Sequence, residues 1–584
     1  MGKSCCSTWR SLLRDGSWTN GGVEIADQVF CGLLKRMNSM NLKTLFADAP
    51  FARDFVTGSG RAREMMGWPG GAEQLAGTVH SRPDFSQPWT PKEIAELEAF
   101  NRVCGNGPGA ALAVKLGDSR TLAIVTGQQP NLLASPFYVV LKAMTAWHLA
   151  ARLEAETGRP VVPIFWVASD DHDFEELRAC RVWSPSSGIT ALGGLVSRGG
   201  ARPDSPAFEW HLKDSATRLM EAMAQGAPEA WNHAPTRAAI ENALEGGPDF
   251  ETSFCRLAAR FLAATPMLFL VPRLTSMRHR QIDVLAREID LAGETNRVVN
   301  EAAVLMESRG YHAQLRRPSN ALNFFYIHES VRCRVLVRPK GDRFEVVDSS
   351  GEVVLRFPDA EGLKAELLRN PERFSPNVVT RPVVQDAALP VVAYVGGPGE
   401  IAYLAQTRGV HELLGVVPSP VVPRASATLL TDEADGLLGG GTEPQDLEAA
   451  LARLTASDAL LGPLVKQRMA LAAVVDEGLR AMEMTDAAQH PHIESAFMKT
   501  RAGVERSLAQ LDRRLQRHFH SRGSGDEWAW FTRVANLVRP GGGSQERMLS
   551  PLSFCATMSP EDFGAWLAIH INWESHTHQI VQIS

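Results

Sequence analysis

The sequence predicts an α/β protein whose core is a doubly wound, parallel β-sheet. Three apolar segments have the length and composition of buried strands, and each runs directly into polar or glycine-rich residues: Thr121 to Thr126, Val161 to Ala168, and Leu389 to Val395. Sheets of this class bind ligands at the carboxyl ends of their strands, where loops and helix N-termini converge. We therefore expect the chemistry at the ends of these three segments.

The segment between the first two strands has the pattern of a crossover helix. We expect the helix to begin at Ser135-Pro136, where the hydroxyl caps the first turn and proline supplies the first helical φ, and to end at Gly158. Apolar residues between these ends recur at helical spacing and predict one buried stripe: Val140, Met144, Trp147 and Ala151. The unit is expected to be a right-handed βαβ crossover.

The composition is typical of a globular protein with several domains. A chain of 584 residues, 44% of them hydrophobic and 22% charged, is long enough for roughly three or four domains. The net charge of −6 argues against nucleic acid as a partner, because phosphate backbones are bound by basic surfaces. Without a long apolar run or a secretory signal, we expect no membrane partner and a cytoplasmic location.

The spacing of the cysteines predicts neither a disulfide framework nor a zinc site: Cys5, Cys6, Cys31, Cys104, Cys180, Cys255, Cys333 and Cys555.

Further segments interrupt or extend the core. Met267 to Val271 has the pattern of a short core strand, and apolar segments separated by turn residues between Phe324 and Phe357 predict an antiparallel meander. Leucines at heptad spacing after Gly441 predict two antiparallel helical arms. Their seam is expected to form a homodimer, with coverage of each arm by the other as the alternative.

These patterns divide the chain into six expected parts. They are an N-terminal extension (1–36), the first half of a Rossmann-like core (37–180), inserted modules with part of the core sheet (181–380), the second half of the core (381–437), an antiparallel coiled coil (438–525), and C-terminal helices with a tail (526–584).

Motifs in the same order along the chain resemble one enzyme family, the bacillithiol biosynthesis cysteine-adding enzymes, which are the cysteine ligases of that pathway. The resemblance is carried by Thr126-Gly127-Gln128-Gln129, by Ser135-Pro136-Phe137-Tyr138 with Lys142, and by Phe165-Trp166-Val167-Ala168 with Asp171-His172-Asp173. It continues to the C-terminus through Arg373 to Pro382, Gly397 to Ile401, Pro423-Arg424, Gln545 to Arg547, and His578 to Val581.

The resemblance implies a fold like that of the class I aminoacyl-tRNA synthetases, with connecting-peptide insertions and an added coiled coil. It also implies a ligase that joins the carboxyl group of cysteine to the amine of glucosaminyl-malate through an amide bond. ATP is the expected cofactor, because amide formation from a free carboxylate is uphill in water. The chain has Ser135-Pro136-Phe137-Tyr138 where the synthetases have a His-x-Gly-His signature, and Ser135 replaces a glycine usual in the family.

The expected catalytic residues follow the second strand. Asp171, His172 and Asp173 are expected to bind the substrate amine, with His172 as the base, because imidazole exchanges protons near neutral pH. The competing interpretation is that Asp171 caps the next helix and His172 packs beneath it. A metal site is a third interpretation, but adjacent residues rarely all face one ion, so we expect none.

The expected substrate-binding residues lie at several strand ends and helix starts. Gln128 and Gln129 offer amide groups to sugar hydroxyls or a malate carboxylate, or else they satisfy the backbone of their own loop. Tyr138 and Lys142 lie one helical turn apart. Lys142 either pairs with a phosphate or carboxylate of the substrate or is a solvated surface lysine.

Three more residues of this kind come from the second half of the chain. Asn377 and Arg381 flank a dense motif, and Arg381 either clamps a substrate carboxylate with its two-pronged guanidinium or forms a structural ion pair. Glu400 either holds the α-amino group of cysteine or caps its own helix.

The glycine-rich turn before Glu400 is the candidate nucleotide site, because its N–H groups are open to a phosphate; a plain tight turn is the alternative. Its glycines are Gly396, Gly397 and Gly399. All of these assignments require the surroundings of Gln128, His172 and Glu400 to meet around a common hollow.

Two functions of other classes stay open. A metal-dependent phosphohydrolase would use Asp170, Asp171, His172 and Asp173 as ligands. A nonenzymatic binding protein would rest on the coiled coil.

Overall fold

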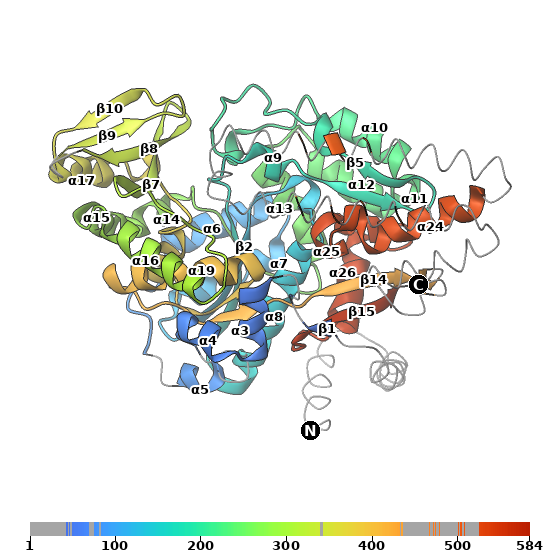
Figure 1. The fold of residues 1–584 in the computed structure, drawn as a ribbon, viewed down its shortest axis with the longest axis horizontal. Coiled ribbons are helices and arrows are strands. Elements are labelled where there is room, and N and C mark those ends of the chain that lie inside the picture. Colours follow the sequence, from blue (N-terminus) through green and yellow to red (C-terminus); the bar gives the residue numbers. More distant parts are fainter. Residues whose placement is uncertain are drawn as a thin grey trace. The chain divides into compact units, whose positions relative to one another are not determined.

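A five-stranded parallel sheet forms the centre of the fold (Figure 1). Its strands lie in the order β13-β12-β2-β3-β6. Each neighbouring pair is parallel, and β2 is paired with β3 along its whole length, from Leu122 opposite Val161 to Gln128 opposite Val167. The strands are β2 (Leu122–Gln128), β3 (Val161–Val167), β6 (Leu268–Leu270), β12 (Val391–Gly396) and β13 (Val421–Pro423). The predicted parallel, Rossmann-like core is therefore confirmed.

The chain divides into two units, Met1–Lys43 and Thr44–Ser584. The computed structural model describes residues 43–44, 46, 49–68, 75–80, 83–338, 343–432, 434–435, isolated positions between 467 and 507, and 525–583. The expected N-terminal extension at 1–36 lies outside these residues. The expected coiled coil at 438–525 lies outside them as well, apart from the isolated positions.

The strand order contains a reversal that decides where a ligand can bind. From β2 the chain proceeds through β3 to β6 on one side, and it later returns to β12 and β13 on the other side of β2. In doubly wound sheets the crevice for ligands lies at such a switch point, outside the carboxyl ends of the two strands that flank it. The ends of β2 and β12 are therefore the expected walls of the site.

The crossover helix α8 (Tyr138–Thr157) connects β2 to β3 and packs on β2, β3 and β12. The predicted start at Ser135-Pro136 is wrong, because the helix begins at Tyr138, and the Ser135 side chain does not cap it. The Ser135–Pro136 peptide bond is cis, and Phe137 N–H donates to the carbonyl of Leu549 in the C-terminal part of the chain. A local capping pattern could not reveal this distant contact.

The end of α8 is as predicted. Gly158 adopts a left-handed conformation with φ 64°, and its N–H donates to the carbonyl of Glu154. Val140 and Met144 of the predicted stripe are buried, whereas Trp147 and Ala151 are half-buried. The helix also buries Leu141, Ala143 and Ala146, which lie outside the stripe. The helix is covered on its outer side by α5 (Leu75–His80) and by aromatic residues near the C-terminus, which contact Phe137.

The segments before and between the core strands are mostly helical. Before β2 lie β1 (Lys43–Thr44), α3 (Pro50–Thr57), α4 (Gly60–Met66), α6 (Pro91–Val103), α7 (Gly107–Ala110) and the 3-10 helix η2 (Ala113–Gly117). Between β2 and β6 lie η3 (Leu132–Ala134), α9 (Phe174–Leu177), the hairpin β4 (Arg181–Ser184) and β5 (Gly188–Ala191), η4 (Gly193–Leu195), η5 (Ala207–Glu209), α10 (Ala216–Gly226), α11 (Pro228–Asn232), α12 (Ala234–Leu244) and α13 (Phe250–Phe261).

The predicted antiparallel meander is confirmed, and in Figure 1 its strands lie together with α17. Its sheet has the order β10-β9-β8-β7-β11. The elements between β6 and β12 are α14 (Thr275–Arg280), α15 (Ile282–Asp290), α16 (Glu294–Ser308), β7 (Ala321–His328), β8 (Val331–Val337), β9 (Phe344–Val347), β10 (Val353–Phe357), α17 (Ala360–Arg369), η6 (Pro371–Arg373), β11 (Phe374–Pro376) and α18 (Arg381–Ala388).

The C-terminal residues are tied to the core by a further sheet. The predicted extended tail is strand β15 (Thr577–Ile583), which pairs in parallel with β14 (Ala427–Thr431). The remaining elements are α19 (Pro398–Leu413), α24 (Gly525–Val538), η8 (Pro540–Gly542), α25 (Gln545–Met548), η9 (Pro551–Phe554) and α26 (Pro560–His570). Gln545 in α25 donates to the carbonyl of Leu429 and accepts from its N–H, so α25 is clamped to β14. No helix of the described part is long and apolar enough to span a membrane.

A buried polar network joins α15, α16 and β7. The carboxylate of Glu288 accepts from the hydroxyl of Thr295 at 3.1 Å and from the N–H of Asn323 at 2.8 Å. Nδ2 of Asn323 also donates to Oδ1 of Asn296. Oδ1 of Asn323 accepts from the side-chain amide of Asn377 at 3.3 Å. Burial is the main cause that raises the pKa of Glu288 from 4.5 to about 7. The meander that carries Asn377 is therefore attached through a group that titrates near neutral pH.

Replacing Glu288 by Gln is expected to change how stability depends on pH. A raised folded-state pKa means that the contribution of Glu288 to stability is complete below pH 4.5 and is lost as pH rises through about 7. The difference in free energy of unfolding between Glu288→Gln and the unmodified protein should therefore shift by about 3 kcal/mol in favour of the variant as pH rises from 4.5 to roughly 8. Urea unfolding followed by circular dichroism measures this. Glu301→Gln, whose side chain is 62% exposed, serves as the control. Parallel pH profiles for the unmodified protein and Glu288→Gln would contradict the expectation.

Candidate functional site

The ends of β2 and β12 are joined by a buried ion pair. Lys142, in the first turns of α8, places its ammonium 2.7 Å from Oε2 of Glu400 in the first turn of α19, and the Lys142 side chain is 1% exposed. The ammonium also donates to the carbonyl of Gly127 in β2. The sequence leaves two alternatives for Lys142, a partner of a substrate phosphate or carboxylate or a solvated surface lysine. The surface alternative is wrong, because an enclosed ammonium needs an anion beside it.

Glu400 receives hydrogen bonds from two further groups. Gly397 N–H donates to Oε2 at 2.8 Å, and the hydroxyl of Tyr394 in β12 donates to Oε1. Burial acts to raise the pKa of Glu400, but the charge of Lys142 and these hydrogen bonds outweigh it and lower the pKa. Burial also lowers the pKa of Lys142, although Glu400 opposes that shift. Glu400 thus caps its own helix while it neutralises Lys142.

The glycine turn was expected to receive a nucleotide phosphate. In the structure the N–H of Gly397 is donated to Glu400, Gly396 is buried, and Gly399 is exposed. The carboxylate of Glu400 thus already uses one of the N–H groups that a phosphate would need. Nucleotide binding by Gly396, Gly397 and Gly399 stays a prediction.

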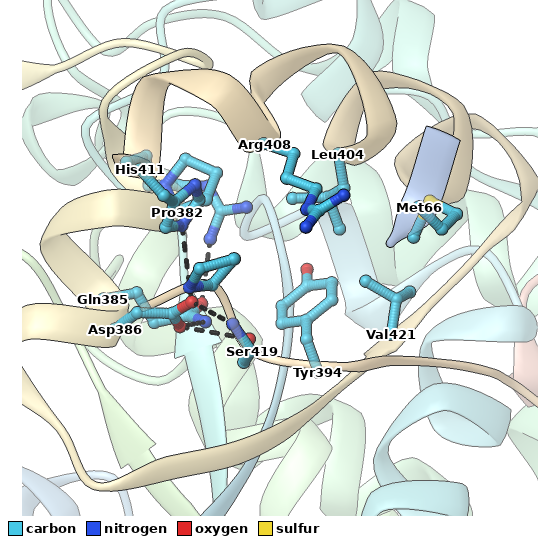
Figure 2. A pocket seen from close by; sticks show the side chains of 12 residues that line it. Met66, Pro382, Gln385, Asp386, Tyr394, Leu404, Arg408, His411, Ser419 and Val421 are labelled. Atoms are coloured by element: carbon cyan, nitrogen blue, oxygen red, sulfur yellow. Dashed lines mark hydrogen bonds and ion pairs between the residues drawn. The ribbon is translucent and has the colours of Figure 1, made fainter. Parts of the chain in front are cut away.

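Arg381 extends the polar cluster away from Glu400. Its guanidinium lies over the ring of Tyr394 and donates to Tyr403 at 3.0 Å and to Gln385 at 3.1 Å. Arg381 and Tyr394 line a cavity of about 30 Å³, which is enough for a water molecule. Figure 2 shows the hydroxyl of Tyr394 and the side chain of Arg408 pointing into this space. Arg381 is thus held by protein groups on one side and borders the cavity on the other.

A second polar cluster follows β3. Asp170 is buried and accepts two hydrogen bonds from Arg278, at 2.7 and 2.9 Å, and one from Ser375 at 2.8 Å. Burial alone would raise its pKa, but the charge of Arg278 lowers it. Asp170 therefore ties β3 to α14 and β11, and both of its oxygens are occupied.

His172 lies beside Arg332, which belongs to the distant strand β8. Nη1 of Arg332 is 2.9 Å from Nδ1 of His172, and the guanidinium also lies over the ring of Phe325. Because a guanidinium can only donate, Nδ1 accepts and the proton of the neutral ring lies on Nε2. Burial, followed by the charge of Arg332, lowers the pKa of His172. The role of His172 as a base stays a prediction. In this arrangement the lone pair on Nδ1, which a base would use to take up a proton, already accepts from Arg332.

The two neighbours of His172 have different local partners. Asp173 caps α9 by accepting from the N–H of Glu176 at 3.0 Å, so the capping role expected for Asp171 falls to Asp173. Asp171 accepts from the N–H of His172 at 2.7 Å and from the side-chain amide of Gln129 at 3.1 Å. The same amide of Gln129 is 3.2 Å from Oε2 of Glu176.

Gln128 and Tyr138 connect these two clusters. The amide of Gln128 donates to Oε1 of Gln129 and thereby orients the amide that contacts Asp171. The charges of Glu176 and Glu400 both raise the pKa of the half-buried Tyr138, after burial as the main cause. Tyr138 is thus under the influence of carboxylates from both clusters, and Lys142 links the carbonyl of Gly127, next to Gln128, to Glu400. A hollow shared by Gln128, His172 and Glu400 stays a prediction.

Asn377 lies beside the site rather than in it. It is buried, its Oδ1 accepts from the N–H of Val379 at 2.8 Å, and its amide donates to Asn323. These contacts are those of a loop-bracing residue. Its substrate-binding role stays a prediction.

Sequence reasoning missed several residues of the site. The sequence does contain a signal for Glu176, because this residue lies three positions after Asp173, in the first turn of the helix that Asp173 caps. Arg332 and Arg278 had no local signal, since each comes from an inserted module far along the chain and reaches the strand end only through tertiary packing.

No group of three His, Cys, Asp or Glu side chains in the described part of the chain is arranged to hold a metal ion. The described cysteines are buried and free: Cys104, Cys180, Cys255, Cys333 and Cys555.

Replacing Lys142 by Met should strongly destabilise the protein, because Glu400 would keep a largely enclosed charge without its partner. We expect a loss of about 3 kcal/mol in free energy of unfolding, with partial recovery in the double variant Lys142→Met/Glu400→Gln. Lys364→Met, which removes a surface contact to Asp290 at 2.8 Å, is the matched control and should cost less than about 1 kcal/mol. Guanidinium unfolding measures all three variants. A Lys142→Met protein as stable as the control would show that the pair does not hold the site together.

Known proteins similar to this chain include two curated relatives named "Putative cysteine ligase BshC". The one from Heliobacterium modesticaldum is 34% identical over 342 residues, covering 56% of this chain and 58% of the relative. The one from Chlorobaculum tepidum is 34% identical over 322 residues, covering 54% of each. These alignments thus span little more than half the length of either relative.

Among solved structures, the chain is similar to one titled as a putative arginyl-tRNA synthetase from Campylobacter jejuni, at 11% identity and a TM-score of 0.21, covering 78% of this chain and 98% of that one. A likeness at this score carries no argument about the fold. The family model described as "Bacillithiol biosynthesis BshC, N-terminal Rossmann-like domain" matches residues 96–425, more than half of the chain and all five strands of the parallel sheet. The chain therefore belongs to the bacillithiol biosynthesis BshC family.

Proposed function

We propose that this protein is a cysteine ligase that joins the carboxyl group of L-cysteine to the amine of glucosaminyl-malate, forming the amide bond of bacillithiol. Membership of the BshC family and the names of the curated relatives support this activity. ATP is the proposed source of free energy, because a free carboxylate must be activated before an amine can displace its oxygen. The described residues do not indicate where the nucleotide lies.

The observation that carries the proposal is the polar lining at the switch point of the sheet. Lys142 and Glu400 lie on the β12 side, and Gln129 and Asp171 lie on the β3 side, with Tyr138 between them. A ligase of this kind must hold an ammonium group and a carboxyl group close together. The acidic side at β3 suits the amine of glucosaminyl-malate. On the β12 side Lys142 is neutralised by Glu400, so Arg381 is the cation that suits a substrate carboxylate.

The remaining expected residues take supporting roles in the proposal. Gln128 and Gln129 present amides to the sugar hydroxyls or malate carboxylates, and Arg381 borders the cavity beside Tyr394. His172 donates through Nε2 rather than acting as a base, because Arg332 occupies Nδ1. Action in the cytoplasm as a homodimer also belongs to the proposal and is supported by the sequence pattern alone.

The alternative of a metal-dependent phosphohydrolase is not favoured by the geometry. Asp170 would have to be a metal ligand, yet Arg278 and Ser375 occupy both of its oxygens. A nonenzymatic role based on the coiled coil concerns residues outside the described ranges, and none of the described contacts favours it.

The proposed reaction is tested by incubating the purified protein with cysteine, glucosaminyl-malate and ATP, and following bacillithiol by mass spectrometry. We expect product only when all three compounds are present. Absence of product from protein shown to be folded by circular dichroism would count against the ligase function.

A variant of Gln129 tests the location of the site in the same assay. Gln129→Leu removes the amide that bridges Asp171 and Glu176, so the KM for glucosaminyl-malate should rise by about tenfold, as expected for the loss of a hydrogen bond to charged groups. Gln87→Leu changes an exposed glutamine before α6 and is the matched control. Equal KM values for the two variants would remove Gln129 from the site.

A further inference from the structure

Glu176 is a carboxylate at the candidate site that sequence reasoning did not assign. It lies on α9, directly after the Asp171-His172-Asp173 motif, and it is exposed. Its Oε2 shares the amide of Gln129 with Asp171, at 3.2 and 3.1 Å respectively. Its Oε1 has no hydrogen-bond partner among the described residues. One oxygen is therefore oriented by the protein, and the other is open to a ligand.

The charged groups around Glu176 come from three parts of the chain. Asp171 and Asp173 approach it from its own loop, Arg547 from α25, and the phenol of Tyr138 from α8. Burial is the largest cause that raises the pKa of Glu176 to about 7; the two aspartates add to it, and Arg547 opposes it. Solvent reaches the carboxyl and screens part of this pKa shift. The upward direction of the shift is what matters for proton transfer, because a higher pKa makes the carboxylate a better proton acceptor.

The other candidate bases of the site are engaged elsewhere. Nδ1 of His172 accepts from Arg332, Asp173 caps α9, and Glu400 is neutralised by Lys142. Asp171 already accepts from the N–H of His172 and from Gln129. Asp173 also keeps one oxygen open, but its other oxygen is held by the N–H of its own helix. Among these groups, Glu176 combines an open oxygen with an exposed side chain that shares the amide of Gln129 with Asp171.

We infer that Glu176 is the general base that accepts the proton of the substrate amine, an inference that rests on the proposed ligase function. The ammonium group of glucosaminyl-malate transfers one proton to the Glu176 carboxylate. The freed nitrogen pair forms the C–N bond to the cysteine carboxyl carbon, which a nucleoside triphosphate has made electrophilic. The C–O bond to the activating group breaks, and the leaving group keeps that pair. The second surplus proton on nitrogen goes to solvent, and Glu176 later releases its own proton to solvent.

The electrostatics of the site suit this step. An ammonium group placed beside Glu176 also lies near Asp171 and Asp173, so the amine binds in its charged form. Binding that ammonium stabilises the ionised form of Glu176, and loss of the proton from the amine leaves a neutral pair of groups. The carboxylate cluster thus attracts the amine, and Glu176 supplies the proton acceptor.

The inference is tested first by the binding of glucosaminyl-malate alone, without cysteine or ATP. Titration calorimetry between pH 6 and pH 8 compares the unmodified protein, Glu176→Gln and the control Glu175→Gln. Glu175 is the adjacent residue, its side chain is 64% exposed, and it pairs with Arg178 at 2.6 Å. The affinity of the unmodified protein and of Glu175→Gln should fall as pH decreases through about 7, whereas Glu176→Gln should bind about tenfold more weakly at pH 8 and lose this dependence. An unchanged pH dependence in Glu176→Gln would overturn the assignment.

The second readout is the pH profile of product formation. With unmodified protein, kcat/KM should rise through an apparent pKa near 7, and Glu176→Gln should lower kcat by about 100-fold and remove that limb. A Glu176→Gln protein within threefold of the control and with the same profile would overturn the assignment. If the unmodified protein makes no bacillithiol, the ligase function fails, while the calorimetry still decides whether Glu176 holds an amine.

Discussion

The ion pair between Lys142 and Glu400 is the constraint on which the site depends. An ammonium enclosed by protein is tolerated only beside an anion, and here the anion comes from a helix that starts more than 250 residues later in the chain. The pair therefore fixes α8 against α19 across the switch point of the sheet. Lys142 also donates to the carbonyl of Gly127 in β2, and Glu400 accepts from the hydroxyl of Tyr394 in β12. The pair therefore fixes the ends of β2 and β12 relative to each other.

A similar arrangement fixes the other side of the site. Asp170 at the end of β3 is held by Arg278 of α14 and Ser375 of β11, and Arg332 of β8 reaches from the meander to His172. These inserted modules thus supply the groups that neutralise and orient the motif after β3. The bidentate pair of Arg424 with Glu546, at 2.6 and 3.0 Å, attaches the C-terminal helices in the same way. Each module contributes a buried charge that needs its partner, and this links the modules to the core.

This distribution of charges gives the two sides of the switch point different chemistry. On the β12 side, carboxylate and ammonium neutralise each other, and Arg381 lies beyond them. On the β3 side, burial and then the charges of Asp171 and Asp173 raise the pKa of Glu176. The β3 side therefore attracts a positive amine, and Arg381 is the cation that borders the cavity on the β12 side. This asymmetry is the physical basis of the proposed ligase function and of the role inferred for Glu176.

The sequence by itself determined the parts of the protein that depend on local pattern. Apolar runs and glycine positions were sufficient for the parallel strands, the meander and the end of α8, because burial periodicity and backbone freedom are written in neighbouring residues. The start of α8 was mispredicted, since a contact of Phe137 with Leu549 decides it. Only the tertiary structure decided that Lys142 is enclosed, that Arg332 occupies the imidazole of His172, and that Glu176 lies beside Gln129. Charge pairing and proton affinity depend on which distant groups come within a few ångströms, and no local pattern encodes that.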